Sequence, residues 1–199
     1  MKIGVILGST RLQSNTAGIT NYVLSILSTR FPTHTIELIN LRTSPNHPLP
    51  LQLDFTIPAV HKLEDLPNAY SDPLVGAWSA TVLSWDAVIV VTPQYNWSVP
   101  APLKNAFDQL LTEWKGKPIA FMAAGGHGGN KVVAALREIC GGGLKMRVAE
   151  KAVGFKLAMD YIAGDKRFVG DEEYFKDYEA AVVECVKELE GLVAAGGRM

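Results

Sequence analysis

The sequence predicts a doubly wound α/β fold, because short hydrophobic runs alternate along the chain with segments of helical periodicity. Apolar runs of this kind, joined through helices, are typical of parallel strands that are buried on both faces. Right-handed crossover connections then leave few possible topologies. The chain has 199 residues, which suits one domain, and we expect that domain to span residues 1–199.

Five strands and five helices are expected in alternation. The most strand-like segment is "AVIVVT" (residues 87–92), which is nearly all β-branched. The strands are predicted at residues 2–7, 35–40, 87–92, 118–123 and 147–153, and the helices near residues 15–30, 74–84, 102–112, 131–139 and in the C-terminal stretch. In that last stretch, the residues at helical spacing are Phe175, Tyr178, Val182, Cys185, Leu189 and Leu192, which we expect to pack on the sheet.

The composition excludes several classes of protein. Hydrophobic residues make up 48% of the chain and charged residues 20%, and the formal net charge is −1. This is a globular balance that offers no basic patch for nucleic acid or for a membrane surface. No apolar run approaches the ~18 residues of a membrane span, and the apolar part of "MKIGVILGST" is too short for a signal peptide.

The two cysteines favour a cytoplasmic protein. Cys140 and Cys185 lie far apart and form no Cys-x-x-Cys motif, so no metal or redox motif is predicted. A disulfide between them is the alternative, but packed, reduced thiols are the simpler expectation for a cytoplasmic chain.

The segment from residue 44 to residue 73 is irregular and rich in proline. Its prolines stand at positions 45, 48, 50, 58, 67 and 73. A connection this long in a compact domain is usually functional or involved in contacts. Prolines at this density predict a semi-rigid segment.

Three loops at one edge of the predicted sheet carry unusual chemistry. In an open parallel sheet, ligands bind beyond the carboxyl ends of the strands, near the point where the strand order reverses. The loops that follow Leu7, Thr92 and Ala123 are therefore the candidates for a binding site.

The first loop, "GSTRLQSNT" (residues 8–16), is suited to a phosphate. Arg11 supplies a guanidinium group, and the free N–H groups of a helix N-terminus follow. Hydroxyl groups come from Ser9, Thr10, Ser14 and Thr16. The loop lacks both the lysine of a P-loop and a G-x-G-x-x-G motif, so nucleoside triphosphates and NAD are poor candidates. The alternative is plain helix capping by Ser14 or Asn15.

The second loop lies in "VTPQYNWSVPAPLKNAFDQL" (residues 91–110) and combines rigid, flat and polar groups. Pro93 ends the strand pairing, and Gln94, Tyr95 and Asn96 then present amide groups and an aromatic face. Such a mixture suits a planar ligand with polar edges. The alternative is that Tyr95 and Trp97 are ordinary packing residues.

The third loop, "AAGGHGGNK" (residues 123–131), places four glycines around His127. Glycines let the backbone approach a ligand closely and present its N–H groups. The alternative is a flexible turn with a surface histidine. No second ligand at useful spacing supports a metal site.

These motifs resemble those of the NAD(P)H-dependent FMN reductases of flavodoxin-like fold, and the fungal quinone reductases among them most of all. The similarity extends over nearly the whole chain. It is carried by "LGSTR" (residues 7–11), "PQYNWSVPAPLKNAFD" (93–108) and "GKPIAFMAAGGHGG" (116–129). It implies a five-stranded parallel sheet of order 2-1-3-4-5 with helices on both faces. Two positions depart from many relatives, which have glycine where this chain has Gln13 and Trp97.

The resemblance also implies a set of FMN-binding residues. The phosphate would be held by Ser9, Arg11, Ser14, Asn15 and Thr16, and the isoalloxazine and ribityl groups would be lined by Pro93, Gln94, Tyr95 and Asn96. The pyrimidine edge would be reached by the loop of Gly125, Gly126, His127, Gly128 and Gly129, mainly through its backbone. Backbone N–H groups or His127 would stabilise negative charge on the reduced flavin.

The activity implied by the resemblance is hydride transfer from NAD(P)H to FMN, followed by reduction of a quinone or a similar small acceptor such as an azo compound, ferric iron or free flavin. The cofactor carries the chemistry, so no catalytic side chain is predicted. A homodimer with the flavin near the interface is also implied. Two alternatives are a flavodoxin-like electron carrier, which is usually strongly acidic, and a regulatory or scaffolding protein that responds to the redox state of its flavin.

Overall fold

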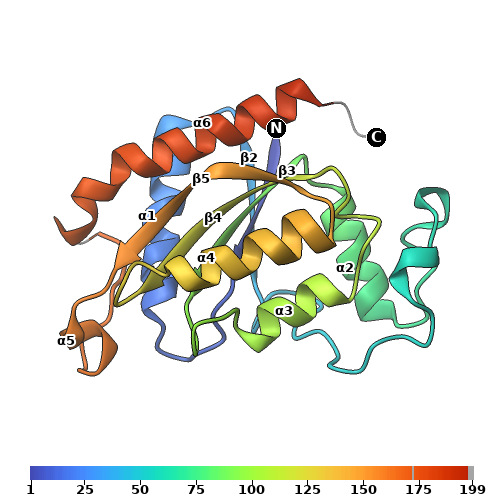
Figure 1. Ribbon diagram of the computed structural model, residues 1–199, viewed down its shortest axis with the longest axis horizontal. Coiled ribbons are helices and arrows are strands. Elements are labelled where there is room, and N and C mark those ends of the chain that lie inside the picture. The colour runs from blue at the N-terminus through green and yellow to red at the C-terminus, as the bar shows by residue number, and fades with distance from the viewer. Residues whose placement is uncertain (172, 197–199) are drawn as a thin grey trace.

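A single parallel sheet forms the centre of the molecule. The computed structural model describes residues 1–171 and 173–196. Its strands are β1 (Lys2–Leu7), β2 (Thr35–Asn40), β3 (Ala87–Pro93), β4 (Pro118–Gly125) and β5 (Arg147–Lys156), and each pairs in parallel in the order β2-β1-β3-β4-β5 (Figure 1). The expected doubly wound, flavodoxin-like topology is confirmed. The strand order reverses at the neighbouring strands β1 and β3, which marks the switch point.

Helices cover both faces of this sheet. On one face lie α1 (Asn15–Arg30) and α6 (Glu179–Ala195), and on the other lie α2 (Pro73–Leu83), α3 (Ala101–Asp108) and α4 (Asn130–Leu136) (Figure 1). A π-helical turn, Arg137–Gly143, continues α4, and the short helix α5 (Met159–Ile162) follows β5. The two helical layers leave the carboxyl ends of the strands as the edge from which the candidate loops emerge.

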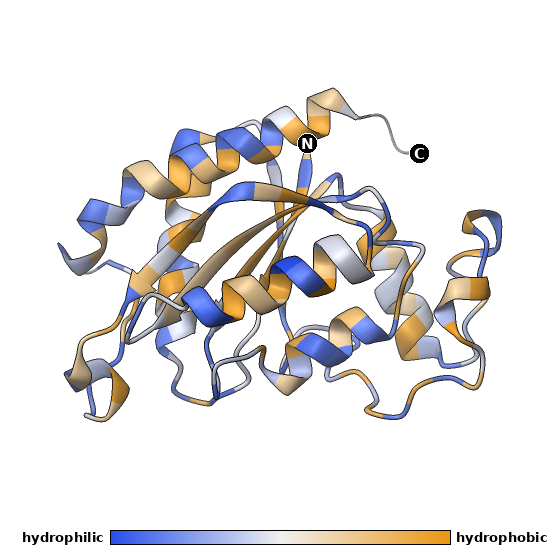
Figure 2. Cartoon of the chain, viewed as in Figure 1, coloured by the Kyte–Doolittle hydropathy of each residue, from blue (hydrophilic) through white to orange (hydrophobic). Residues whose placement is uncertain are grey.

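The side chains of the strands alternate between two cores. In β3, Ile89 and Val91 pack with α1 and α6, whereas Val88 and Val90 pack on the opposite face, and all four are fully buried. Figure 2 shows this hydrophobic sheet lying between helices whose surfaces are striped with hydrophilic residues. Two-sided burial explains why this strand was the most distinct in the sequence.

The ends of several elements differ from the sequence expectation. Strand β5 extends to Lys156, and its register with β4 shifts between Ile119 and Phe121, after which Phe121 pairs with Ala152. Helix α3 ends at Asp108, four residues earlier than expected. Phe175 and Tyr178 lie in a 3₁₀ turn, Glu173–Tyr178, that precedes α6. Hydrophobic spacing alone does not separate these short turns from an α-helix.

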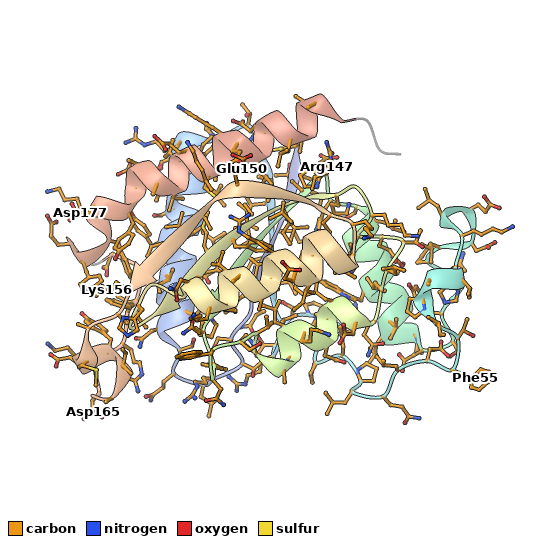
Figure 3. The ribbon with its side chains drawn as sticks, in the orientation of Figure 1. Phe55, Arg147, Glu150, Lys156, Asp165 and Asp177 are labelled. Atoms are coloured by element: carbon orange, nitrogen blue, oxygen red, sulfur yellow. The ribbon has the colours of Figure 1, made fainter. Side chains whose placement is uncertain are left out.

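The proline-rich segment before α2 projects from one end of the body. It contains two short 3₁₀ turns, Pro58–Val60 and Leu63–Asp65. Phe55 is fully exposed and points away from the molecule, at the opposite end from Asp165 (Figure 3). The side chain of Gln109 anchors the segment by donating to the carbonyl of Pro50 at 2.7 Å.

Both cysteines are free and buried, as expected for packed thiols. Burial raises the pKa of the Cys140 thiol and that of the Cys185 thiol to about 12 each. Within the described residues, no helix has the length and hydrophobicity to cross a membrane, and no three His, Cys, Asp or Glu side chains gather as a metal site would require.

Candidate functional site

A cleft of about 280 Å³ opens at the carboxyl edge of the sheet, beside the switch point. Four loops line it, one each from the ends of β1, β3, β4 and β5. The lining residues are Arg11, Gln13, Ser14, Asn15 and Thr16 after β1, Pro93, Gln94 and Tyr95 at β3, Ala124, Gly125 and Gly126 at β4, and Leu157, Tyr161, Ile162 and Arg167 after β5. The three loops singled out in the sequence therefore meet, and a fourth joins them.

The N-terminus of α1 is open toward this cleft. Ser14 occupies the N-cap position in an extended conformation, but its side chain makes no capping hydrogen bond, and the first turn holds no acidic residue. By contrast, Asp72 caps α2 by accepting from the N–H of Leu74 at 2.7 Å. The simple capping interpretation is therefore wrong for Ser14. Free N–H groups and the helix dipole favour an anion here.

Tyr95 orients Arg11 at the same end of the cleft. The Nε group of Arg11 donates to the Tyr95 hydroxyl at 2.8 Å, and its guanidinium carbon lies 4.8 Å from the centroid of the tyrosine ring. Ser9, only 2% exposed, places its Oγ 3.2 Å from the same hydroxyl. Within the described residues, the two Nη groups of Arg11 make no hydrogen bond, so they remain available to a ligand.

Gln94 joins the second loop to the third. Its N–H donates to the carbonyl of Ala124 at 2.9 Å, and its Oε1 accepts from the N–H of Lys131 at 2.9 Å and from that of Val132 at 3.2 Å. The side-chain carbonyl of Gln94 therefore caps α4. These bonds hold the loops after β3 and β4 in a fixed relation.

Asn96 and Trp97 form a tight turn at the rim. Tyr95 and Ser98 pair across it, and Asn96 and Trp97 both adopt positive φ, 47° and 66°. Trp97 is 72% exposed, and the Nζ of Lys131 lies 5.0 Å from the centroid of its indole ring. Trp97 is therefore not a core residue, which rules out the packing alternative for this side chain.

The glycine loop forms a tight turn whose geometry requires glycine. Gly128 and Gly129 adopt φ near +70°, and a Cβ on Gly129 would lie 2.7 Å from the Cβ of Ala123. The N–H of Gly128 donates to the carbonyl of Gly125 at 2.9 Å. This turn presents Gly125 and Gly126 to the cleft.

Asn15 attaches the fourth loop to the first. Its Nδ2 donates to the carbonyl of Tyr161 at 2.6 Å, and its Oδ1 accepts from the N–H of Phe168 at 3.1 Å. The Asn15 amide therefore holds the segment from residue 161 to residue 168 by two hydrogen bonds. These bonds bring Tyr161 and Arg167 to the cleft.

Several predicted residues lie outside the lining of the cleft: Ser9, Asn96, His127, Gly128 and Gly129. Ser9 is buried beside the Tyr95 hydroxyl, and His127 is exposed. Five further residues line the cleft that the sequence did not predict as site residues: Ala124, Leu157, Tyr161, Ile162 and Arg167. Gln13, which differs from the glycine of many relatives, lines it as well. No local pattern marks the residues after β5. They reach the cleft through the long-range hydrogen bonds of Asn15.

This sheet order, with a cleft at the switch point and an open helix N-terminus in it, defines a protein of flavodoxin-like fold. A family model described as NADPH-dependent FMN reductase matches residues 1–160. The chain belongs to the NADPH-dependent FMN reductase family. This confirms the oxidoreductase class expected from the sequence.

Three known proteins illustrate the similarity. The NAD(P)H-dependent FMN reductase LOT6 of Saccharomyces cerevisiae is 37% identical over 155 residues, which cover 74% of this chain and 77% of the yeast protein. An NADPH:quinone oxidoreductase of Arabidopsis thaliana is 29% identical over 143 residues, or 70% of this chain and 66% of the plant protein. The solved structure of FerB, a flavoenzyme NAD(P)H:(acceptor) oxidoreductase from Paracoccus denitrificans, superposes with a TM-score of 0.66 at 22% identity, covering 96% of this chain and 97% of that one.

Proposed function

We propose that the whole chain is one FMN-binding domain, which holds FMN in this cleft and passes electrons from NAD(P)H to quinones or similar small acceptors. The observation that carries the proposal is the uncapped N-terminus of α1, which opens into the cleft that Tyr95 and Gly125 also line. Similarity to an NADPH:quinone oxidoreductase and to yeast LOT6 supports both the cofactor and the class of acceptor.

The residues of the cleft fit FMN. A phosphate would accept from the open N–H groups at the start of α1 and from the Nη groups of Arg11, and it would meet no acidic side chain in the first helical turn. When bound, FMN supplies the chemistry: it accepts a hydride from NAD(P)H and delivers electrons to the acceptor.

The role that we propose for the chain's own groups is to bind the flavin and to orient its ring system. Pro93 and Tyr95 offer a rigid, flat surface to the isoalloxazine ring, and the backbone N–H groups near Gly125 and Gly126 offer donors to its pyrimidine edge. Donors fixed in advance stabilise negative charge without reorganising. His127 is exposed, so we assign it no part in this step.

We further propose that the protein works in the cytoplasm as a homodimer with the cofactor near the subunit interface. Free, buried cysteines support the location. The family resemblance supports the dimer. Light scattering of the purified protein tests it: a mass of twice 21.6 kDa is expected, and a monomer would contradict the dimer.

Anaerobic spectroscopy tests the function directly. The purified or reconstituted protein should show flavin absorbance, NADPH or NADH should bleach it, and a quinone should restore it over repeated cycles. A protein that takes up no flavin would overturn the proposal. A flavin that neither nucleotide reduces at a useful rate would indicate an electron carrier instead, while bleaching without recovery by any small acceptor would favour a redox-responsive binding protein.

A further inference from the structure

We propose that Arg167 is a second arginine ligand of the flavin phosphate, contributed by the segment after β5. The inference rests on the proposed function and extends it, because it makes the anion site two-sided. Arg167 lies beyond residues 1–160, to which the family model extends. It lines the same cleft as Ser14 and Thr16 at the start of α1.

The segment that carries Arg167 is fixed against the end of the first loop, residues 8–16. Asn15, the first residue of α1, bonds both the Tyr161 carbonyl and the N–H of Phe168, the residue that follows Arg167. Phe168 is 3% exposed, and its ring stacks on that of Tyr161 with centroids 3.8 Å apart. Arg167 is therefore held close to the open helix N-terminus by its chain neighbour.

The guanidinium of Arg167 is oriented but has one edge available. Its Nη1 donates to the carbonyls of Gly164 and Lys166 at 2.8 and 2.6 Å. Within the described residues, Nε and Nη2 make no hydrogen bond, and these two groups form the edge that binds two oxygens of one anion. A guanidinium held in this way loses little freedom on binding.

No carboxylate in the described part of the chain forms an ion pair with Arg167. Asp160, on the same segment, is paired with Lys166 at 2.9 Å. The charge is then available for a ligand. A phosphate monoester carries about −1.5 to −2 at neutral pH, whereas a helix N-terminus supplies only about +0.5. Arg11 adds one positive charge, so the helix end and Arg11 together fall short of a fully dianionic phosphate, and Arg167 would supply the remainder.

The test separates the phosphate from the rest of the flavin. FMN and riboflavin, which lacks the phosphate, are each titrated into the wild type and the Arg167→Gln variant, and binding is followed by flavin fluorescence. Arg42→Gln is the matched control, because Arg42 is also exposed at this edge of the sheet but lines a different cavity. We expect R167Q to weaken FMN binding about ten- to hundredfold, with riboflavin binding unchanged and R42Q like the wild type.

An equal loss of FMN and riboflavin binding would overturn the assignment, because Arg167 would then only shape the segment. Unchanged FMN binding in R167Q would overturn it as well, and it would leave the proposed function intact if the wild type binds FMN. A wild type that binds neither flavin overturns the proposed function and this inference together. If R167Q does not fold, the Arg167→Lys variant is titrated instead. Weaker binding of FMN with riboflavin binding unchanged supports the assignment, and affinities for both flavins equal to those of the wild type contradict it.

Discussion

Tyr95 fixes the direction in which Arg11 can act. A lone arginine on a loop loses much of its conformational freedom when it binds. Here the hydroxyl of Tyr95 holds Nε at 2.8 Å, and the ring lies under the guanidinium. The Nη pair is thereby presented to the cleft before any ligand arrives, which would strengthen the proposed phosphate binding by reducing the ordering cost.

Replacing Arg11 therefore removes the charged and oriented group that we propose as a ligand of the phosphate. Arg11→Ala should weaken FMN binding by about 1.5–3 kcal/mol, the range for a hydrogen bond to a charged group. Tyr95→Phe keeps the ring contact but removes the hydroxyl, so a smaller loss of about 0.5–1.5 kcal/mol is expected. Calorimetric titration with FMN measures both values. An Arg11→Ala variant that retains its flavin like the wild type would refute the phosphate assignment.

Trp97 carries local backbone strain. A non-glycine residue in the left-handed region costs roughly 1–2 kcal/mol, and Trp97 stands there with φ of 66°. Trp97→Gly should therefore be more stable than Trp97→Ala by about 1 kcal/mol, although alanine is otherwise the less costly residue in most ordered structure. Urea unfolding of the two variants gives the difference. If the Trp97→Ala variant were as stable as the Trp97→Gly variant or more stable, the turn would have relaxed to another conformation.

The sequence predicted the cleft-lining residues that sit at strand ends, and it did not predict those that depend on distant contacts. Pro93, Tyr95 and Gly125 follow strong apolar runs, so the rule for ligand sites in parallel sheets located them. Tyr161 and Arg167 follow no such signal. Asn15 bonds Tyr161 across 146 residues of sequence, and no local periodicity encodes a contact of that range.

At the scale of elements, the segment from residue 161 to residue 168 is docked on α1 through a glycine. A Cβ on Gly18 would lie 2.2 Å from the carbonyl oxygen of Phe168, which is too close for any side chain. Gly170, with φ of 117°, passes Asn21 in the next turn of the same helix. Helix α1 therefore supports the first loop at its N-terminus and the fourth loop along its side.

Gly18→Ala should dislodge that segment. Overpacking costs about 1–3 kcal/mol, which outweighs the gain of roughly 1 kcal/mol in helix propensity. Gly76→Ala in α2 is the control, because its nearest neighbour would lie at 3.4 Å and stability should be unchanged or slightly raised. Thermal unfolding and FMN affinity together check the prediction. If both variants gained stability equally, the docking of the segment on α1 would not be tight.

The strands buried on both faces and the helices with regular hydrophobic spacing were predicted well, whereas the short irregular elements were not. Strands β1, β2 and β3 begin where the sequence indicated, and α1 has both predicted ends. The π-helical turn ends in three glycines, Gly141 to Gly143, whose low helix propensity obscures any periodic signal. Helix α5 spans only Met159–Ile162, too short for periodicity to register.

At the scale of the whole molecule, the buried thiols link stability to pH. Burial raises the pKa of Cys140 and that of Cys185 to about 12, whereas an unfolded thiol titrates near 8.5. Above about pH 9 the unfolded chain has released these protons while the folded chain keeps them. The folded state therefore binds more protons, and the free energy of unfolding decreases as pH rises.

Each thiol should lower the free energy of unfolding by about 1.4 kcal/mol per pH unit between roughly pH 9 and pH 12. Urea unfolding at pH 8 and pH 10.5 measures the decrease, and a Cys140→Ala, Cys185→Ala double variant should show a smaller one. Equal pH dependence in both proteins would contradict the role of the thiols.

The central claim is that one flavin spans the four loops, with its phosphate at the start of α1. The crystal structure of the FMN complex tests it most directly. We predict that the phosphate accepts hydrogen bonds from the backbone of Asn15 and Thr16 and from the Arg11 guanidinium, with the ring system beside Tyr95 and Gly125. A flavin whose phosphate lies elsewhere, or whose ring system is remote from these loops, would contradict the account.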